Sequence, residues 1–256
     1  LRRRQRQMCI RDSYYTDIAY GEFKSTQRIL INFVDEYEIL NKAGVYAVEV
    51  VDADYDGDND LILGKTDGYV RFYRFDGNVQ NLTYVCNLGF GDYGDWAYPT
   101  AVDLDGDGDL DFAVGYSDGF VRYFKNNNTD GNICGSNWDV NNNWFNKDFG
   151  YDAAPWFVDL DADGDYDILV GNNSGYIYYY ENKGVDADGN VIWEEVSNDL
   201  VGNIGSATKP TVADLDDDGD MDIVATYYDH LLYFLNDGNK THFKFWRQRS
   251  YGSGLE

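Results

Sequence analysis

Four short segments of this 256-residue chain have aspartate at every second position, at residues 52–60, 103–111, 159–167 and 214–222. They hold 21 of the chain's 46 acidic residues. Carboxylates about 4 Å apart repel each other by about 4 kcal/mol per pair at an effective dielectric constant of about 20, so such a segment would open in isolation. A hard cation removes that penalty, and calcium accepts about six to eight oxygen ligands in flexible geometry. The spacing therefore predicts four calcium-binding loops, called loops one to four in chain order.

The first, third, fifth and ninth aspartates of each loop are the expected side-chain ligands, because residues two apart point the same way in an extended loop. The seventh aspartate is expected to contribute its backbone carbonyl. The predicted metal-binding set is Asp52, Asp54, Asp56, Asp58, Asp60, Asp103, Asp105, Asp107, Asp109, Asp111, Asp159, Asp161, Asp163, Asp165, Asp167, Asp214, Asp216, Asp218, Asp220 and Asp222. About four calcium ions would bring the net charge from -26 to about -18.

The sixth residue of every loop is glycine, at Gly57, Gly108, Gly164 and Gly219. We expect the chain to turn sharply around the ion there, where a side chain would collide. An EF-hand begins in the same way, but it needs a bidentate glutamate at its twelfth position and flanking helices. The twelfth residues here are Leu63, Val114, Val170 and Ala225. The remaining alternative is a solvated acidic fringe that caps turns, which would not require glycine and alternation in every copy.

The loops recur at spacings of 51, 56 and 55 residues, which indicates a repeat architecture. Pro99, Pro155 and Pro210 each lie four residues before the first aspartate of a loop and mark the start of a strand. Sixteen residues after that aspartate stands a glycine in three copies and His230 in the fourth. The pairs Asp67-Gly68 and Asp118-Gly119 predict tight hairpins whose central residues have positive φ.

Each repeat offers four strand patterns. In the third copy PWFVDL enters the loop, DILVG leaves it and YIYYYEN follows a turn. A fourth strand is expected after a variable connector, as LTYVCNLG, WFNKDFG, VIWEEV and HFKFWR in successive copies. Repeat length alone would also suit a solenoid or a string of sandwiches, but four strands per repeat favour a propeller blade. We predict an all-β protein, a β-propeller of four complete four-stranded blades plus a truncated N-terminal blade, either closed or an open arc of a larger propeller.

The pattern DxDxDGDxD, followed by an apolar strand that ends in glycine, resembles the FG-GAP and VCBS repeats of integrin-type β-propellers over about residues 17–247. The resemblance implies blades around a central axis, with a calcium loop joining the first two strands of each repeat. It also implies an extracellular protein concerned with adhesion or carbohydrates. Propellers of that family commonly have more blades, so the chain is expected to be a fragment. Residues 17–21 parallel residues 167–171, which suggests a repeat at the N-terminal end that lacks its first part.

The expected organisation follows from these repeats. Residues 1–13, which resemble translated adapter sequence, form a non-native head, and residues 248–256 form a tail. Residues 14–247 form the propeller repeats, divided into 14–44 (partial), 45–94, 95–150, 151–205 and 206–247.

The net charge of -26 argues against nucleic acid or an anionic membrane as a partner. No apolar run is long enough to insert into a membrane. No secretory signal is visible, but the head hides the native start, and the calcium loops and four N-x-S/T sequons favour an extracellular or cell-surface location. The three cysteines fit neither a zinc motif nor a disulfide framework, and whether Cys86 and Cys134 pair stays open.

The metals are expected to be structural, because His230 and His242 belong to no recognisable catalytic constellation. The preferred hypothesis is therefore a noncatalytic recognition or adhesion module that binds a protein or glycan through its connectors, of which residues 126–146 are the longest. A second hypothesis is a lectin in which Trp96, Trp138, Trp144 and Trp156 stack on sugars, although burial between blades would also explain them. A third is an accessory propeller of a larger polysaccharide-active enzyme.

Overall fold

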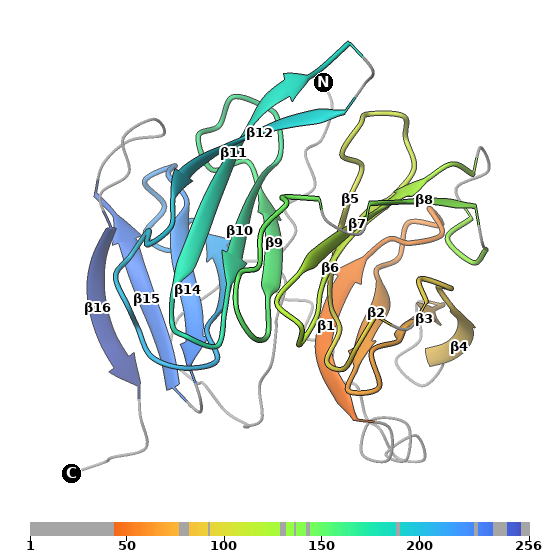
Figure 1. Ribbon diagram of the computed structural model, residues 1–256, viewed down its shortest axis with the longest axis horizontal. Helices are drawn as coiled ribbons and strands as arrows, with labels where there is room; N and C mark the ends of the chain where they lie inside the picture. Colours follow the sequence, from red (N-terminus) through yellow and green to blue (C-terminus); the bar gives the residue numbers. More distant parts are fainter. Residues whose placement is uncertain are drawn as a thin grey trace.

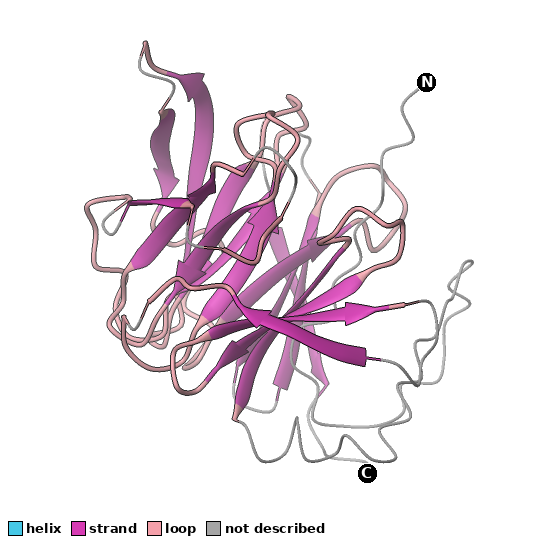
Figure 2. Cartoon of the chain, turned by 90° about the vertical axis from the view of Figure 1, so that its right-hand side faces the viewer, coloured by secondary structure: helices cyan, strands magenta, loops and turns pink. Residues whose placement is uncertain are grey.

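The computed structural model describes residues 44–76, 82–91, 93–128, 132–135, 137–141, 144–187, 190–227, 230–237 and 245–251. These residues form four antiparallel sheets of four strands each (Figure 1). Strands and loops alone make up this part of the chain, and it contains no helix that could cross a membrane (Figure 2). The predicted β-propeller with four-stranded blades is confirmed, while the expected N-terminal partial blade lies outside the described residues.

The sheets follow the chain as blades one to four, and each is a simple meander. Blade one contains β1 (Val45–Val51), β2 (Asp60–Lys65), β3 (Val70–Phe75) and β4 (Leu82–Asn87). Blade two contains β5 (Tyr98–Val102), β6 (Asp111–Gly115), β7 (Val121–Asn126) and β8 (Trp138–Asn141). Blade three contains β9 (Ala154–Val158), β10 (Asp167–Gly171), β11 (Ile177–Val185) and β12 (Val191–Ser197). Blade four contains β13 (Lys209–Ala213), β14 (Asp222–Tyr227), β15 (His230–Asn236) and β16 (Phe245–Tyr251).

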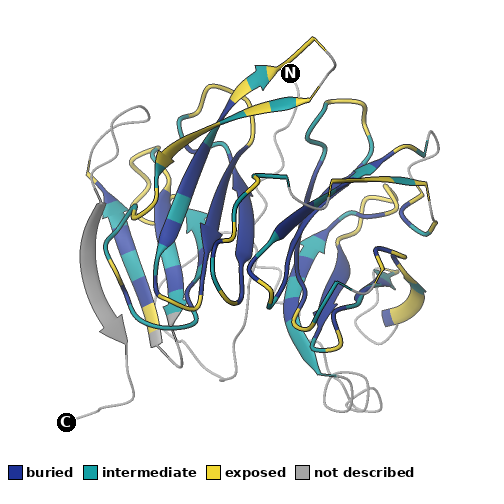
Figure 3. Ribbon diagram, viewed as in Figure 1, coloured by how far each residue is buried: buried dark blue, intermediate teal, exposed yellow. Residues whose placement is uncertain are grey.

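The first strands of the blades, β1, β5, β9 and β13, are the inner strands and contact one another in chain order. The apolar second strands β2, β6 and β10 are buried along their whole length. Strands β6 and β10 lie between two neighbouring sheets, whereas β2 packs against blade two on one face and into a cluster of blade-one residues on the other. Separate hydrophobic cores fill the spaces between blades one and two, two and three, and three and four. Figure 3 shows buried residues along the inner strands, whereas exposed residues gather in the loops and on the outer strands β4 and β12.

Glycines at the ends of the second strands let the blades approach closely. A Cβ atom on Gly64 would lie 2.1 Å from the Ala97 carbonyl oxygen and 2.6 Å from Pro99 Cδ of the next blade. Gly115 and Gly171 meet the following blades in the same way, at 2.0 Å and 2.4 Å from a carbonyl oxygen. Blade four has Thr226 at this place, and no described blade follows it.

The three prolines are each the second residue of a first strand, one residue later than predicted.

The fourth strand of blade two differs from the prediction. We expected it at residues 144–150, but β8 lies at residues 138–141 and pairs with β7. Trp144 and Phe145 pack instead into the core between blades two and three. Asn146 then has φ of 49°, which breaks an extended backbone. The aromatic run therefore serves as core filling, whereas β4, β12 and β16 overlap the segments that were predicted for them.

The hairpins between the second and third strands also differ in detail. In the first blade the Gly68 N–H donates to the Lys65 carbonyl oxygen at 3.0 Å, and Gly68 has φ of 78°. Gly119 and Gly175 have φ of 86° and 91° in the next two blades. Among the described turn residues positive φ belongs to the glycine alone, so the expectation of two such central residues is wrong.

A disulfide joins Cys86 of β4 to Cys134 in the connector that follows β7, with 5.9 Å between the two Cα atoms. It ties the outer edge of blade one to blade two. The Trp138 indole reinforces the same junction, because its Nε1–H donates to the Leu88 carbonyl oxygen at 2.9 Å. The question that the sequence left open about these two cysteines is thereby answered.

Candidate metal centres

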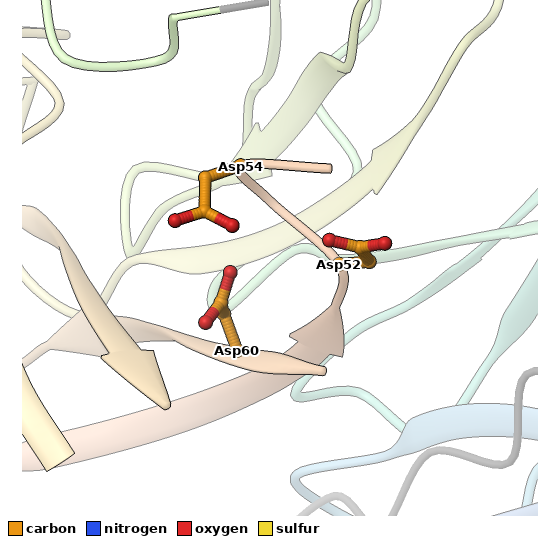
Figure 4. A group of neighbouring side chains, drawn as sticks. All are labelled: Asp52, Asp54 and Asp60. Carbon is orange, nitrogen blue, oxygen red and sulfur yellow. The ribbon is translucent and has the colours of Figure 1, made fainter. Parts of the chain in front are cut away.

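The four acidic loops join the first and second strands of their blades, as the strand patterns on either side of them predicted. In each loop three carboxylates offer oxygen atoms that all lie within 4.8 Å of one another. In loop one these belong to Asp52, Asp54 and Asp60, whose carboxylates gather around a common point in Figure 4. In the other loops the first, third and fifth aspartates form the group: Asp103, Asp105 and Asp107; Asp159, Asp161 and Asp163; Asp214, Asp216 and Asp218. We call the first, third and fifth aspartates of each loop the mouth carboxylates.

Backbone N–H groups hold the mouth carboxylates in place. The N–H of the sixth-position glycine donates to the first aspartate in all four loops, at 3.2, 3.1, 3.4 and 3.2 Å. In loops one to three the N–H of the fifth residue donates to the third aspartate, at 3.3, 3.2 and 3.1 Å. Each loop therefore curls around its own carboxylates and keeps their remaining oxygens together.

The sixth-position glycines adopt a backbone conformation that favours glycine. Their φ angles lie between 95° and 108°, a region that other residues rarely adopt. A Cβ atom on any of them would meet no protein atom within 4 Å, so the expected collision does not come from the chain itself. The backbone conformation itself demands glycine at this position.

The fourth position is a second left-handed site, which the sequence analysis missed. Its φ is 61° at Tyr55, 76° at Gly106, 56° at Ala162 and 61° at Asp217. Glycine and aspartate tolerate this region, but tyrosine and alanine do so at a cost of roughly 1–2 kcal/mol. Because the residue type changes from copy to copy, no pattern in the sequence marked the position.

The ninth aspartate of each loop is the first residue of the second strand and is completely or almost completely buried. In blade two the Leu104 N–H and the Tyr123 hydroxyl donate to Asp111 Oδ2 at 3.3 Å and 2.8 Å. The Asn126 N–H donates to its other oxygen at 2.8 Å. Asp111 therefore anchors the start of the loop to the end of β7.

The same anchor recurs in the other blades. In blade three Asp167 accepts from the Leu160 N–H at 3.1 Å, the Asn182 N–H at 2.9 Å and the Tyr179 hydroxyl at 2.9 Å. The carboxylates of Asp60 and Asp222 each accept hydrogen bonds from two backbone N–H groups, at 2.7–3.0 Å. We call these four residues the floor carboxylates. Asp60 is the one floor carboxylate that also belongs to a metal-ligand group. Blade one has Phe72 at the position of Tyr123 and Tyr179 in the next two blades, so Asp60 receives no tyrosine hydrogen bond there.

Burial dominates the acidity of the floor carboxylates. It raises the pKa of Asp60 to about 6 and the pKa values of Asp111 and Asp167 to about 7, although their hydrogen bonds act in the opposite direction. Burial also raises the pKa of Asp222. At the mouths, burial and then neighbouring carboxylates raise the pKa values of Asp54 and Asp103. Each loop therefore favours a bound proton or a bound cation.

The donor set suits a hard divalent cation. Oxygens at about 2.4 Å from a common calcium ion are at most about 4.8 Å apart, and the oxygens of each group all lie within that limit. Asp52 Oδ1 and Asp103 Oδ1 are buried and accept no hydrogen bond from the described residues. Such buried oxygens need a hydrogen-bond donor or a cation as a partner. None of the described groups contains histidine or cysteine, the ligands that zinc prefers.

The seventh-position aspartates, Asp58, Asp109, Asp165 and Asp220, contribute no side chain to these groups, and neither does Asp56 at the fifth position of loop one. The N–H of each seventh residue donates to the fifth-position carboxylate at 2.9–3.0 Å. That their carbonyls bind an ion, and that the floor carboxylates complete the ligand shell, stay predictions. The twelfth residues lie in the second strands with no more than 1% of their surface exposed, as expected for a loop unlike an EF-hand.

The tryptophans considered for sugar stacking divide into two kinds. Trp156 is buried between blades three and four, and Trp138 packs against the core between blades one and two. Trp144 stacks on Tyr123, with 4.6 Å between the ring centroids. Trp96 differs, because it is 37% exposed and stacks on Tyr46 beside the β2–β3 hairpin, at the other end of the strands from the acidic loops. Core packing thus explains Trp138, Trp144 and Trp156 without a sugar ligand.

A family model described as an FG-GAP-like repeat matches three overlapping stretches, residues 52–114, 103–170 and 159–225. No curated protein matches the chain. Among solved structures, a lectin from Agrocybe aegerita, described as recognising non-reducing terminal N-acetylglucosamine, is 21% identical over 78% of this chain and 51% of that chain, with a TM-score of 0.48. The Photorhabdus luminescens Tc holotoxin pore is 16% identical over 81% of this chain and 12% of that chain, with a TM-score of 0.31. The chain thus spans about half the length of the lectin.

Proposed function

Because the chain belongs to the family of FG-GAP-like repeat proteins, we propose that it is a calcium-binding, noncatalytic β-propeller module for recognition or adhesion outside the cell, with a protein as its first candidate partner. The observation that carries the calcium part is the recurrence, in all four blades, of three carboxylates whose oxygens lie within 4.8 Å. Repulsion among them is relieved only when positive charge enters the loop.

The bound ion has a structural role. Each loop connects an inner strand to the buried second strand of the same blade. Drawing the mouth carboxylates together fixes this connection and stabilises the blade. Calcium supplies charge neutralisation and coordination, while the aspartates hold the ion and the backbone N–H groups orient the aspartates.

The proposed location outside the cell is supported by two features. The Cys86–Cys134 disulfide is of a kind that persists in oxidising compartments. Extracellular calcium also reaches concentrations that fill weak sites with Kd of about 10⁻⁴–10⁻³ M.

The noncatalytic role is supported by how the acidic residues are used. Floor carboxylates accept hydrogen bonds from the chain's own backbone, and mouth carboxylates face one another. Neither arrangement leaves an acid or base directed at a substrate.

Thermal unfolding in calcium and in chelator tests the proposal. We expect calcium to raise the unfolding midpoint in the millimolar range, because it binds the folded loops and hardly binds the unfolded chain. Magnesium at the same concentration is the control, and it should act more weakly because it needs near-ideal octahedral geometry. Identical midpoints with calcium and with chelator would contradict the proposal.

A glycan partner is the second candidate, and the exposed Trp96–Tyr46 stack favours it. A glycan array probed with the protein and with Trp96→Ala separates the two candidates. A lectin gives a defined sugar preference that the substitution weakens. A protein-recognition module gives none.

A further inference from the structure

In each of blades one to three, one residue of the third strand lies beside the acidic loop, and its charge changes from blade to blade. It directly precedes the residue whose N–H donates to the floor carboxylate. The four residues at this position are Arg74, Lys125, Glu181 and Leu235. The loops are otherwise similar, so this position supplies a local difference in charge.

Loops one and two already hold a positive group of the chain. Lys125 Nζ forms an ion pair with Asp105 Oδ2, a mouth carboxylate of loop two. Arg74 Nη1 lies 4.0 Å from Asp54 Oδ2, the corresponding atom of loop one, while its Nε pairs more closely with Asp76 Oδ1 at 2.8 Å. Each cation lies where it partly compensates the carboxylates, so a metal ion has to displace it or tolerate its repulsion.

Loop three has the opposite arrangement. Glu181, an acid, stands at this position and interacts with the mouth carboxylate Asp161. Lys183 forms an ion pair with Glu181 and also lies 3.6 Å from Glu194, so its charge is shared between two acids. Loop three therefore brings one more carboxylate toward its mouth.

We propose that this third-strand residue sets the order in which the loops bind calcium: loop three, with Glu181 beside its mouth, is the tightest of loops one to three, and loops one and two are weaker because of Arg74 and Lys125. The inference rests on the proposed calcium binding and deepens it. Even at the dielectric constant of water, a unit charge about 6 Å from a divalent ion changes its affinity about tenfold. Loops two and three, which differ by two unit charges at this position, should differ by up to about a hundredfold.

Hydrogen exchange of the intact chain, measured by mass spectrometry along a calcium titration, tests the order loop by loop. Peptides that cover residues 103–111 and 159–167 report the midpoint of protection of loops two and three separately. We expect loop three to gain protection at a lower calcium concentration than loop two. Loop four, which has Leu235 at the same position, is the internal reference.

Two matched variants assign the effect to the side chains. Lys125→Met should lower the midpoint of loop two about tenfold, and Glu181→Gln should raise that of loop three about tenfold, with loop four unchanged in both. Unfolding midpoints in chelator show whether each variant still folds. If a variant fails to fold, the midpoints of loops one, two and three in the parent chain still test the order.

The outcomes separate the two proposals. If no loop gains protection at millimolar calcium, the calcium proposal itself fails. If all loops gain protection at one midpoint and neither variant moves it, calcium binding stands and the proposed order is overturned.

Discussion

Aspartate residues at the mouth and at the floor of each acidic loop have opposite roles. Floor carboxylates such as Asp167 are buried, and their oxygens accept hydrogen bonds from backbone N–H groups and a tyrosine. Mouth carboxylates such as Asp103 and Asp107 face one another, and Asp103 Oδ1 accepts no hydrogen bond from the described residues. A carboxylate that the chain satisfies by itself stabilises the fold without a ligand, whereas one left facing its neighbours stabilises it only when a cation arrives.

The largest effect should come from removing a floor carboxylate. Asp167→Ala leaves the Leu160 and Asn182 N–H groups without their acceptor inside the protein. Two buried donors left unsatisfied, at about 1–3 kcal/mol each, should lower the free energy of unfolding by about 2–6 kcal/mol, in calcium and in chelator alike. Urea unfolding measures both. A loss confined to calcium would show that the floor depends on the ion. Asp167→Asn, which keeps the volume, is the milder variant.

The next largest effect should come from a mouth carboxylate. Asp107→Ala should lower the free energy of unfolding by about 1–3 kcal/mol when calcium is present at about 10–100 times its Kd. In chelator it should change little, because apart from the ion the variant loses only the exposed hydrogen bond from the Asp109 N–H. Thermal unfolding of the parent and variant in both buffers is the measurement. Equal losses in the two buffers would remove the distinction between mouth and floor.

The pH dependence of stability should also distinguish the floor from the mouth. The folded pKa values of Asp60, Asp111 and Asp167, about 6, 7 and 7, lie above the ordinary value of 3.8, so protonation stabilises the fold. In chelator this contribution is complete below about pH 4 and is lost as the pH rises through 6 to 7. Calcium competes with protons at the mouths, so the rise in midpoint that it produces should be larger at pH 7.5 than at pH 5. Unfolding scans at both pH values, with calcium and with chelator, check these directions. A rise in midpoint that is the same at both pH values would contradict the competition.

The smallest expected effect concerns the left-handed fourth position at the mouth. Ala162→Gly should raise the free energy of unfolding by roughly 1 kcal/mol, because glycine adopts φ of 56° without strain. Gly106→Ala is the matched control in the second loop and should lower it by a similar amount. Urea unfolding resolves both changes. Effects of the same sign for the two variants would contradict this explanation.

The sequence alone predicted the blades because their signals are local. Alternating aspartates, the glycine at position six and the apolar runs at residues 61–63, 112–114 and 168–170 report backbone shape and burial directly. The close approach of the blades at Gly64 is also marked in the sequence, because the same position holds glycine in three copies and Thr226 in the fourth.

The rest depended on contacts between residues distant in sequence. Asp111 is recognisable as an acid, but its anchoring role follows from N–H groups at Leu104 and Asn126, which only the folded blade brings together. Trp144 was assigned to a strand because its run is apolar and aromatic, yet a neighbouring blade provides a core for it. The same local pattern suits either environment, so tertiary packing decides.

Calcium content of the intact protein tests the central claim most directly. After removal of chelator and dialysis against millimolar calcium, native mass spectrometry or elemental analysis should find about four calcium ions per chain, consistent with a carboxylate group in each of four loops. Removing a mouth carboxylate, as in Asp107→Ala, should lower the count by about one. A chain that retains no calcium under these conditions would contradict the account.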